Sequence, residues 1–376
     1  MLNRRLLKNV DYTFLFVICL ILGLSLLILS SATANIGTDP LFYVKKQILW
    51  IGLGIVGALV MLSFDYTKLL RFDYVIYGLV ILSLVAVLLI GHASHGAQQW
   101  ISLGPFLLQP SEFGKILMVI CFASFLVKRQ GELRRFRDLL PCFLYFSFPL
   151  LLVLAQPDLG TSLVFIAILF GMLYLAGARP VLLLGLLGGG LAAVAIALAL
   201  HFSPLHLPLP LQDYQIARLV VFLDPYRDPQ GHGYHIIQSL VAIGSGWFWG
   251  KGLYNGSQVQ LNFLPEHHTD FIFSVVGEEL GFLGASLLLF LYFNLLSRAL
   301  QAAFQARDLF GRLLIGGILS MWLFHILENI GMTIGLMPVT GIPLPFLSYG
   351  GSFMLTNMIA VGLILNVHLR REKMLF

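Results

Sequence analysis

The sequence contains very little charge for its length. Only 11% of its 376 residues are charged and 58% are hydrophobic, whereas soluble domains carry roughly 25% charged residues. This composition excludes an ordinary soluble fold. Repeated apolar runs of about 18–22 residues instead predict an all-α polytopic membrane protein, because a helix satisfies its own backbone hydrogen bonds inside a bilayer.

Cysteine and nucleotide-binding motifs are scarce as well. The three cysteines, Cys19, Cys121 and Cys142, fall in apolar runs without metal-binding spacing, so we expect them to be packing residues. The glycine-rich piece 250–252 lacks the Walker pattern, and no Rossmann fingerprint or nucleophile elbow is present. Any reaction must then draw its energy from the substrate itself or from a gradient.

The apolar runs predict about ten transmembrane helices in one domain, residues 1–376. The first run follows Arg4, Arg5 and Lys8, and a signal-peptidase-like Ala32-Thr33-Ala34 comes after it. At about 19 residues it is too long for a typical signal peptide, so we expect a retained helix. The predicted spans are 13–31, 47–64, 73–91, 111–128, 139–156, 159–177, 180–201, 270–297, 312–334 and 346–368.

The basic residues predict the orientation of these spans. With the N-terminus inside, all but six of the 23 Lys and Arg residues fall in inside segments. The positive-inside rule then places both termini in the cytoplasm. A long extracytoplasmic loop, 202–269, lies between helices seven and eight, and its apolar pieces 219–223 and 236–243 are too short to span. The net charge of +5 is modest and belongs to short loops, so it does not predict nucleic-acid binding.

The most unusual polar stretch is 264–273, at the mouth of predicted span eight. It places Asp270 directly after His267, His268 and Thr269. Asp270 has two interpretations of similar weight: a cap of the helix N-terminus, or a functional acid at membrane depth. Residues 274, 277 and 278 follow at i+4, i+7 and i+8, which predicts a polar groove on the same helix face.

Two further stretches place lysines at helix mouths on the same side. Ser111 is a candidate N-cap of span four, and Glu112 and Lys115 are spaced to pair on one helix face. This pair is either a structural ion pair or a cation for phosphate with an acid that positions it. Lys46 opens span two, where the alternative is a snorkelling lysine.

Asp158, Arg218 and Glu328 complete the polar set. Asp158 is predicted chiefly as the N-cap of span six, with Thr161 at the third helical position. Arg218 lies in an amphipathic piece and could hold a lipid headgroup or a substrate phosphate. Glu328 and Asn329, in span nine, are expected to make internal polar contacts. The acids and cations thus gather on the predicted outer side, where they suit an anionic substrate reached from the membrane.

Several motifs, taken together, resemble the SEDS proteins (shape, elongation, division and sporulation). They are PEHHTDFIF at 265–273, GEELG at 277–281, QPSEFGK at 109–115, QPDLGT at 156–161 and PLPFLSYGGS at 343–352. Further pieces resemble the elongation member, RodA, more than the division member, FtsW: GYHIIQS at 233–239, GSQ at 256–258 and LNFLPE at 261–266. One departure is His267, where elongation members usually carry Arg.

The resemblance implies a peptidoglycan glycosyltransferase that polymerises lipid II during cell elongation and shape maintenance. It would be a multi-pass protein of the bacterial cytoplasmic (inner) membrane, with its active site facing the extracytoplasmic side. Asp270 would be the general base of an inverting transfer. The residues expected to bind or position the substrate are Lys115, Glu112, Arg218, Lys46, His268 and Asp158.

The resemblance also implies partners. These are lipid II, a class B penicillin-binding protein transpeptidase and other membrane proteins of the elongation complex. No cofactor follows with certainty from the sequence; a divalent cation could share the charge of the pyrophosphate, but no ligand cluster in the sequence proves one. The alternatives are a lipid II flippase, which needs ionisable groups along a path across the membrane, and a scaffold of the wall-synthesis complex.

Overall fold

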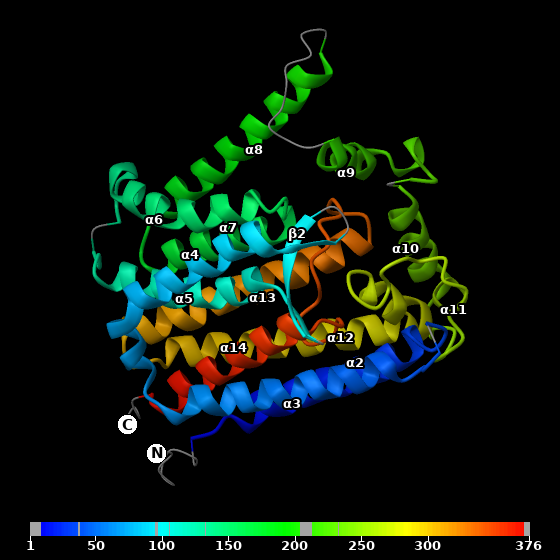
Figure 1. Cartoon of the computed structure of the whole chain (residues 1–376), viewed down its shortest axis with the longest axis horizontal. Helices are drawn as coiled ribbons and strands as arrows, with labels where there is room; N and C mark the ends of the chain where they lie inside the picture. Colours follow the sequence, from blue (N-terminus) through cyan, green and yellow to red (C-terminus); the bar gives the residue numbers. More distant parts are fainter. Residues whose placement is uncertain are drawn as a thin grey trace.

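Ten long apolar helices, one for each predicted span, make up most of the structure (Figure 1). The computed structural model describes residues 9–36, 38–94, 97–104, 106–131, 133–203, 213–231 and 233–371. Within these residues nine helices are long and apolar enough to cross a membrane, and α7 is slightly shorter. The prediction of a helical membrane protein with about ten spans is confirmed. The helices are α2 (Tyr12–Ala32), α3 (Phe42–Ser63), α4 (Asp73–Ile90), α5 (Pro110–Val127), α6 (Phe136–Leu154), α7 (Leu159–Leu175), α8 (Pro180–Phe202), α12 (Ile272–Phe304), α13 (Leu309–Thr333) and α14 (Gly351–Leu369).

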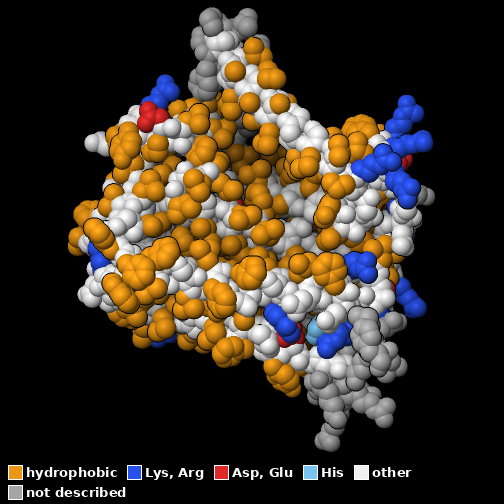
Figure 2. All heavy atoms as spheres, turned by 180° about the vertical axis from the view of Figure 1, so that it is seen from behind, with side chains coloured by type: hydrophobic (Ala, Val, Ile, Leu, Met, Phe, Trp, Pro, Cys, Tyr) orange, Lys and Arg blue, Asp and Glu red, His pale blue; other side chains and the backbone are white. Residues whose placement is uncertain are grey.

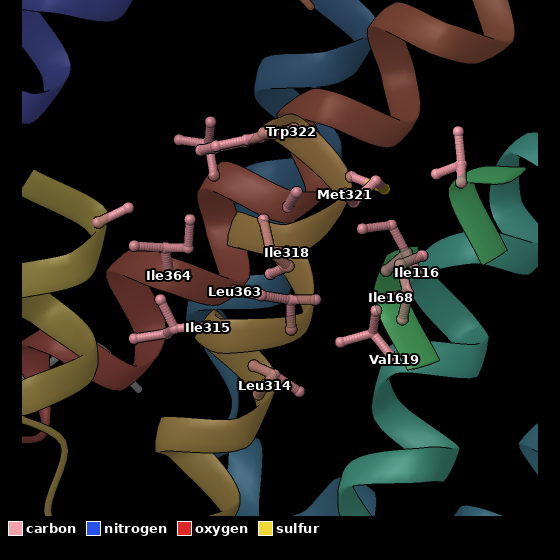
Figure 3. Packing of buried hydrophobic residues seen from close by; sticks show 14 of the residues in the cluster. Ile116, Val119, Ile168, Leu314, Ile315, Ile318, Met321, Trp322, Leu363 and Ile364 are labelled. Atoms are coloured by element: carbon pink, nitrogen blue, oxygen red, sulfur yellow. The ribbon is translucent and has the colours of Figure 1, made fainter. Parts of the chain in front are cut away.

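The core lies around α13 and α14. Buried residues make up 89% of an 18-residue apolar stretch of α14 and 67% of one in α13, against 6% for α8. Figure 3 shows Ile318 of α13 and Leu363 of α14 next to each other, facing Ile116 of α5 and Ile168 of α7. Because α13 and α14 are central, the segment that connects them, 334–350, reaches into the interior of the bundle.

The helices that surround this core expose apolar side chains to the bilayer. Hydrophobic side chains cover most of the face in Figure 2. That face is hollowed beside α8, which stands away from the bundle in Figure 1. Cys121 and Cys142 are buried as expected, but Cys19 is exposed on α2, and the three thiols are free.

The longest helix, α12, is broken near its start. Gly281 has φ 63° and ψ −161°, and the amides of Phe282 and Leu283 bond to the carbonyl oxygens of Trp247 and Phe248 at 2.9 and 3.2 Å. A Cβ on Gly281 would lie 2.2 Å from the amide nitrogen of Gly250. Only glycine fits here, because the neighbouring turn crosses directly over the break.

The connections contain structure that the all-α prediction missed. Strands β1 (His92–Ser94), β2 (Ala97–Leu103) and β3 (Phe106–Leu108) form an antiparallel sheet in the order β1-β2-β3. A 3-10 helix, η1 (Tyr66–Phe72), precedes α4. The predicted loop 202–269 holds α9 (Asp213–Leu223), η2 (Pro225–Arg227), α10 (Tyr234–Ser245) and α11 (Ser257–Gln260). Its two short apolar pieces lie within α9 and α10.

Candidate active site

Asp270 lies in a tight turn just before α12. The helix begins at Ile272, and its N-cap is Phe271, without a side-chain cap. The amides of Thr269 and Phe271 both donate to the carbonyl oxygen of Glu266, whose φ is 51°. The capping interpretation of Asp270 is therefore wrong. Within the described residues, its carboxylate accepts no hydrogen bond from a neighbouring group.

The segment 334–350, between α13 and α14, forms a wall of the site beside the turn that carries Asp270. Pro338, Pro343 and Pro345 keep part of this segment out of helix. Gly341, at φ 77°, lies so close that a Cβ there would be 3.2 Å from Oδ2 of Asp270. On this side the carboxylate of Asp270 therefore faces the backbone of Gly341, which has no side chain to fill the space.

Charge and burial both act on Asp270. Burial is the largest cause that raises the pKa of Asp270 to about 7; the negative charges of Glu266 and Asp158 add to it, and the positive charge of Arg218 opposes it. A carboxyl group with this pKa is poised to accept and release a proton near neutral pH. His268 is different, because burial lowers its pKa to about 4 and keeps its ring neutral.

Arg218, on α9, reaches the segment beside Asp270. Its Nη1 donates to the carbonyl oxygen of Thr340 at 3.5 Å, which is a long contact. The hydroxyl of Thr340 donates in turn to Oε1 of Glu328, on α13, at 3.0 Å. The predicted internal role of Glu328 is thus confirmed, since its carboxylate fastens the wall that Arg218 approaches.

Lys115 is completely buried beneath this wall. Its Nζ donates to Oε1 of Glu112 at 2.7 Å, so the predicted pairing on one face of α5 is confirmed. On its other side, Nζ lies 3.1 Å from Nε2 of His325, whose Nδ1 lies 3.0 Å from the carbonyl oxygen of Pro343. His325 therefore accepts from Lys115 and donates to Pro343, which links the ion pair to the wall. Ser111 does not cap α5, because the helix begins at Pro110.

Asp158 interacts electrostatically with both Lys115 and Asp270. It caps α7 as predicted, with Oδ1 accepting from the amide of Thr161 at 2.9 Å, and Oδ2 accepts from Nε2 of Gln109 at 3.3 Å. Burial raises the pKa of Asp158, and the positive charge of Lys115 acts against that rise. Its charge acts on Asp270 as well. The structure therefore brings Asp270, Arg218, Asp158, Glu112 and Lys115 into one electrostatic group.

His268 and Lys46 lie to one side of that group. The His268 ring packs between Tyr43 and Tyr349, with centroids 4.9 and 6.0 Å away, and its Nδ1 is buried without a partner in the described chain. Lys46 is exposed, with Nζ 4.4 Å from the centre of the Phe42 ring. His268 thus packs against α3, the helix that carries Lys46.

The predicted polar groove beneath Asp270 is occupied by a hydrogen bond and an ion pair. Oγ of Ser274 lies 2.7 Å from Oγ of Ser239, on α10. Oε1 of Glu278, a fully buried carboxylate, accepts from Nζ of Lys251 at 2.7 Å. These side chains therefore hold the segment 234–260 against α12.

Sequence reasoning missed His325 as a partner of Lys115. A signal was present, because His325, Glu328 and Asn329 recur at i, i+3 and i+4 in an apolar helix, and such a stripe marks one face. Asn329 was expected only to make internal contacts. A divalent cation finds no ligand set here: the described residues contain no group of three or more His, Cys, Asp or Glu placed to hold a metal ion.

Comparison with known proteins identifies the family. The family model of FtsW, RodA and SpoVE, described as cell cycle protein, matches residues 10–373. The chain belongs to the FtsW/RodA/SpoVE family. The family predicted from the sequence motifs is thus confirmed.

Individual members of the FtsW/RodA/SpoVE family align over nearly their whole length. Peptidoglycan glycosyltransferase MrdB of Escherichia coli (strain K12) is 40% identical over 365 residues, 97% of this chain and 95% of MrdB. Stage V sporulation protein E of Bacillus subtilis (strain 168) is 37% identical over 366 residues, 95% of this chain and 96% of that protein. The name of the first confirms the predicted enzyme class.

Solved structures of the FtsW/RodA/SpoVE family have the same overall fold as this chain. A chain from a peptidoglycan synthase complex that coordinates polymerization and crosslinking has a TM-score of 0.79 and 32% identity, covering 96% of this chain and 97% of that one. Rod shape determining protein RodA of Thermus thermophilus has a TM-score of 0.70 and 29% identity, covering 97% of this chain and 98% of RodA. This family member is therefore a multi-pass membrane protein.

Proposed function

We propose that this chain is a peptidoglycan glycosyltransferase that polymerises lipid II at the extracytoplasmic surface of the cytoplasmic membrane. The observation that carries the proposal is the carboxylate of Asp270, which accepts no hydrogen bond from the described residues and has a pKa raised to about 7. It lies in one electrostatic group with the cations Arg218 and Lys115. The names of the relatives support the enzyme class.

Asp270 acts as the general base in this mechanism. It takes the proton from the 4-hydroxyl of the acceptor N-acetylglucosamine as that oxygen attacks C1 of the donor N-acetylmuramic acid. The new O–C1 bond forms while the bond from C1 to the pyrophosphate oxygen breaks, and undecaprenyl pyrophosphate leaves with the electron pair. Attack from the opposite face converts the α-linkage to β. General-base catalysis of this kind contributes roughly 10²–10⁴-fold.

Arg218 and Lys115 stabilise the negative charge that grows on the leaving pyrophosphate. Preorganised cations in a site with little water are effective, because they need no reorganisation during the reaction. Arg218 is part-exposed and can contact the phosphate directly. Lys115 is completely buried, so it acts through its field and through the wall that His325 and Pro343 connect to it. Glu112 holds Lys115 in position.

Orientation and biological role extend the proposal. The bias of Lys and Arg supports an orientation with both termini in the cytoplasm and the Asp270 group outside. The motifs similar to RodA support a role in elongation, although relatives include sporulation and division proteins. The similarity to a chain of a complex that polymerises and crosslinks supports a class B penicillin-binding protein as partner.

Reconstitution with labelled lipid II tests the proposal against its two rivals. Purified protein in liposomes should produce glycan strands, and Asp270→Asn should reduce the rate by two or more orders of magnitude. Asp224→Asn is the matched control, because Asp224 caps η2 at an exposed position of the same region. Near-normal polymerisation by Asp270→Asn rejects the assignment. Translocation without polymer indicates a flippase, and neither activity indicates a scaffold.

A further inference from the structure

A polar cavity lies where α2 begins and where α12 and α14 end. Its volume is about 320 Å³, and its lining includes Asp11, Arg298, Gln301, His368 and Arg371. These residues are far apart in the sequence and come from three helices that meet at the same end of the bundle (Figure 1). The cavity is at the opposite end of α12 and α14 from the Asp270 group, so it is separate from the proposed active site.

Asp11 is the acid in this lining, and its two oxygens are already engaged. Oδ1 accepts from the amide of Phe14 at 3.0 Å, which caps α2. Oδ2 accepts from Nε and Nη2 of Arg298 at 2.9 and 2.7 Å. Nη1 of Arg298 donates to Oε1 of Gln301 at 2.9 Å. This bond orients the amide of Gln301 and leaves its Nε2 hydrogens for another acceptor.

Two further polar groups in the cavity have no close hydrogen-bond partner among the described residues. His368 is only 6% exposed, and its Nδ1 is buried with no hydrogen-bond partner among the described residues. The Arg371 guanidinium makes one long contact there, 3.5 Å from Nη1 to the carbonyl oxygen of Asn9. An unpartnered buried polar atom calls for an explanation. The Arg371 guanidinium brings unused donors and a positive charge, and His368 in its Nδ1–H tautomer adds one more donor, so an anion would satisfy both groups.

We propose that this cavity binds the phosphate of an anionic phospholipid headgroup. A guanidinium presents paired N–H donors that match phosphate oxygens, and His368 and Gln301 supply further donors from two other sides. The cavity lies at helix ends, where the headgroups of a bilayer are. Basic pockets between transmembrane helices on the cytoplasmic side are suited to anionic lipids. That sidedness rests on the proposed orientation. The bound lipid would join the start of α2 to the ends of α12 and α14.

The test compares lipid binding by purified full-length protein, two variants of the cavity and one control variant. Native mass spectrometry would measure retention of phosphatidylglycerol and phosphatidylcholine after exchange from mixed micelles. We expect selective retention of phosphatidylglycerol, weakened about tenfold by Arg371→Gln, which removes a charge-assisted contact. Gln301→Glu, of almost the same shape, should weaken it too, because it adds a negative charge and keeps an acceptor for Arg298. Arg312→Gln is the matched control, since Arg312 is an exposed arginine near the start of α13.

Three results would overturn the proposal. They are equal retention of the two lipids, equal loss in Arg371→Gln and Arg312→Gln, or full competition by millimolar inorganic phosphate, which would assign the cavity to a soluble anion. Polymerisation of lipid II is measured on the same preparations. Because the readout of the cavity is bound lipid and not glycan, failure of one proposal leaves the other standing.

Discussion

Asn329 holds the backbone of Asp270. Its Nδ2 donates to the carbonyl oxygen of Asp270 at 2.7 Å and to that of Ile342 at 2.8 Å. One amide therefore fastens the turn before α12 to the segment between α13 and α14. Since Gly341 precedes Ile342 and lies against the carboxylate of Asp270, Asn329 sets the width of the site.

Replacing Asn329 with leucine should reduce polymerisation without abolishing substrate binding. Leucine is similar in volume but donates no hydrogen bond, so both carbonyl oxygens lose their partner and the base shifts. A misplacement of about 1 Å costs on the order of 10²-fold in rate. We expect a fall in kcat of that order with a small change in KM, measured with labelled lipid II in detergent.

Asn357 provides the control for this substitution. It is another buried asparagine, with Nδ2 bonded to the carbonyl oxygen of Phe353 and Oδ1 accepting from Trp322. Asn357→Leu should lower thermal stability by a similar amount while retaining most of kcat. If both variants lose kcat equally, the effect of Asn329 is general destabilisation.

The pH dependence of the reaction should report Asp270. Its pKa is raised to about 7, and a protonated carboxyl group cannot accept the proton of the acceptor hydroxyl. The value of kcat/KM should therefore fall as the pH drops through about 7 and level off above it. A rate that is flat between pH 5 and 8 would contradict Asp270 as the base.

Substitutions of two charged neighbours of Asp270 should shift the inflection of this pH profile, near pH 7, in opposite directions. Glu266→Gln removes a negative charge that raises the pKa of Asp270, so the inflection should shift to lower pH. Arg218→Gln removes a positive charge that lowers this pKa, so the inflection should shift to higher pH, with an added loss of rate. Shifts in the same direction would show that another group controls the profile.

The pair of Lys115 and Glu112 offers a way to separate stability from activity. Lys115→Met should lower the free energy of unfolding by about 3–5 kcal/mol, because it leaves the carboxylate of Glu112 buried without its cation. Adding Glu112→Gln should recover much of that loss, since no buried charge is then unpaired. Thermal unfolding in detergent measures both effects.

Activity should not recover in the double variant. Lys115 is proposed to stabilise charge on the leaving pyrophosphate, and neither methionine nor glutamine supplies a cation. If the double variant polymerises lipid II at the wild-type rate, the pair is purely structural. A single His325→Gln substitution, which keeps an acceptor for Lys115, should retain more activity than His325→Leu.

Local spacing was sufficient to predict some of these features. The ten apolar runs correspond to the ten long helices, and the cap formed by Asp158 and the pair of Glu112 with Lys115 depend on residues three apart. Such contacts follow from helix geometry alone. The amphipathic piece that contains Arg218 also became a helix, α9.

Contacts between distant segments could not be predicted in this way. His325 meets Lys115 across 210 positions of sequence, which depends on how α5 packs against α13. The break of α12 at Gly281 exists because Trp247 and Phe248 supply carbonyl acceptors from another segment. The strands between residues 92 and 108 are too short for a long alternating pattern of polar and apolar residues, so the sequence predicted a loop there and not a sheet.

His267 leads to the last prediction, because this is where the sequence departs from the elongation members it resembles. Its ring is 4% exposed, with Nδ1 2.5 Å from the carbonyl oxygen of Leu264 and Nε2 2.7 Å from that of Ala32. Carbonyl oxygens only accept, so a ring nitrogen that carries a hydrogen donates to the carbonyl oxygen it faces. Arginine, with five donors, can serve two carbonyl oxygens as well.

His267→Arg should therefore retain the thermal stability and polymerisation rate of the wild type, provided that the longer side chain reaches both oxygens. His267→Phe keeps an aromatic ring but leaves two buried carbonyl oxygens unpaired, at roughly 1–3 kcal/mol each. It should lower the unfolding temperature. It should also lower kcat, because the end of α2 no longer holds the turn that carries Asp270. Equal behaviour of the phenylalanine and arginine variants would show that His267 contributes shape alone.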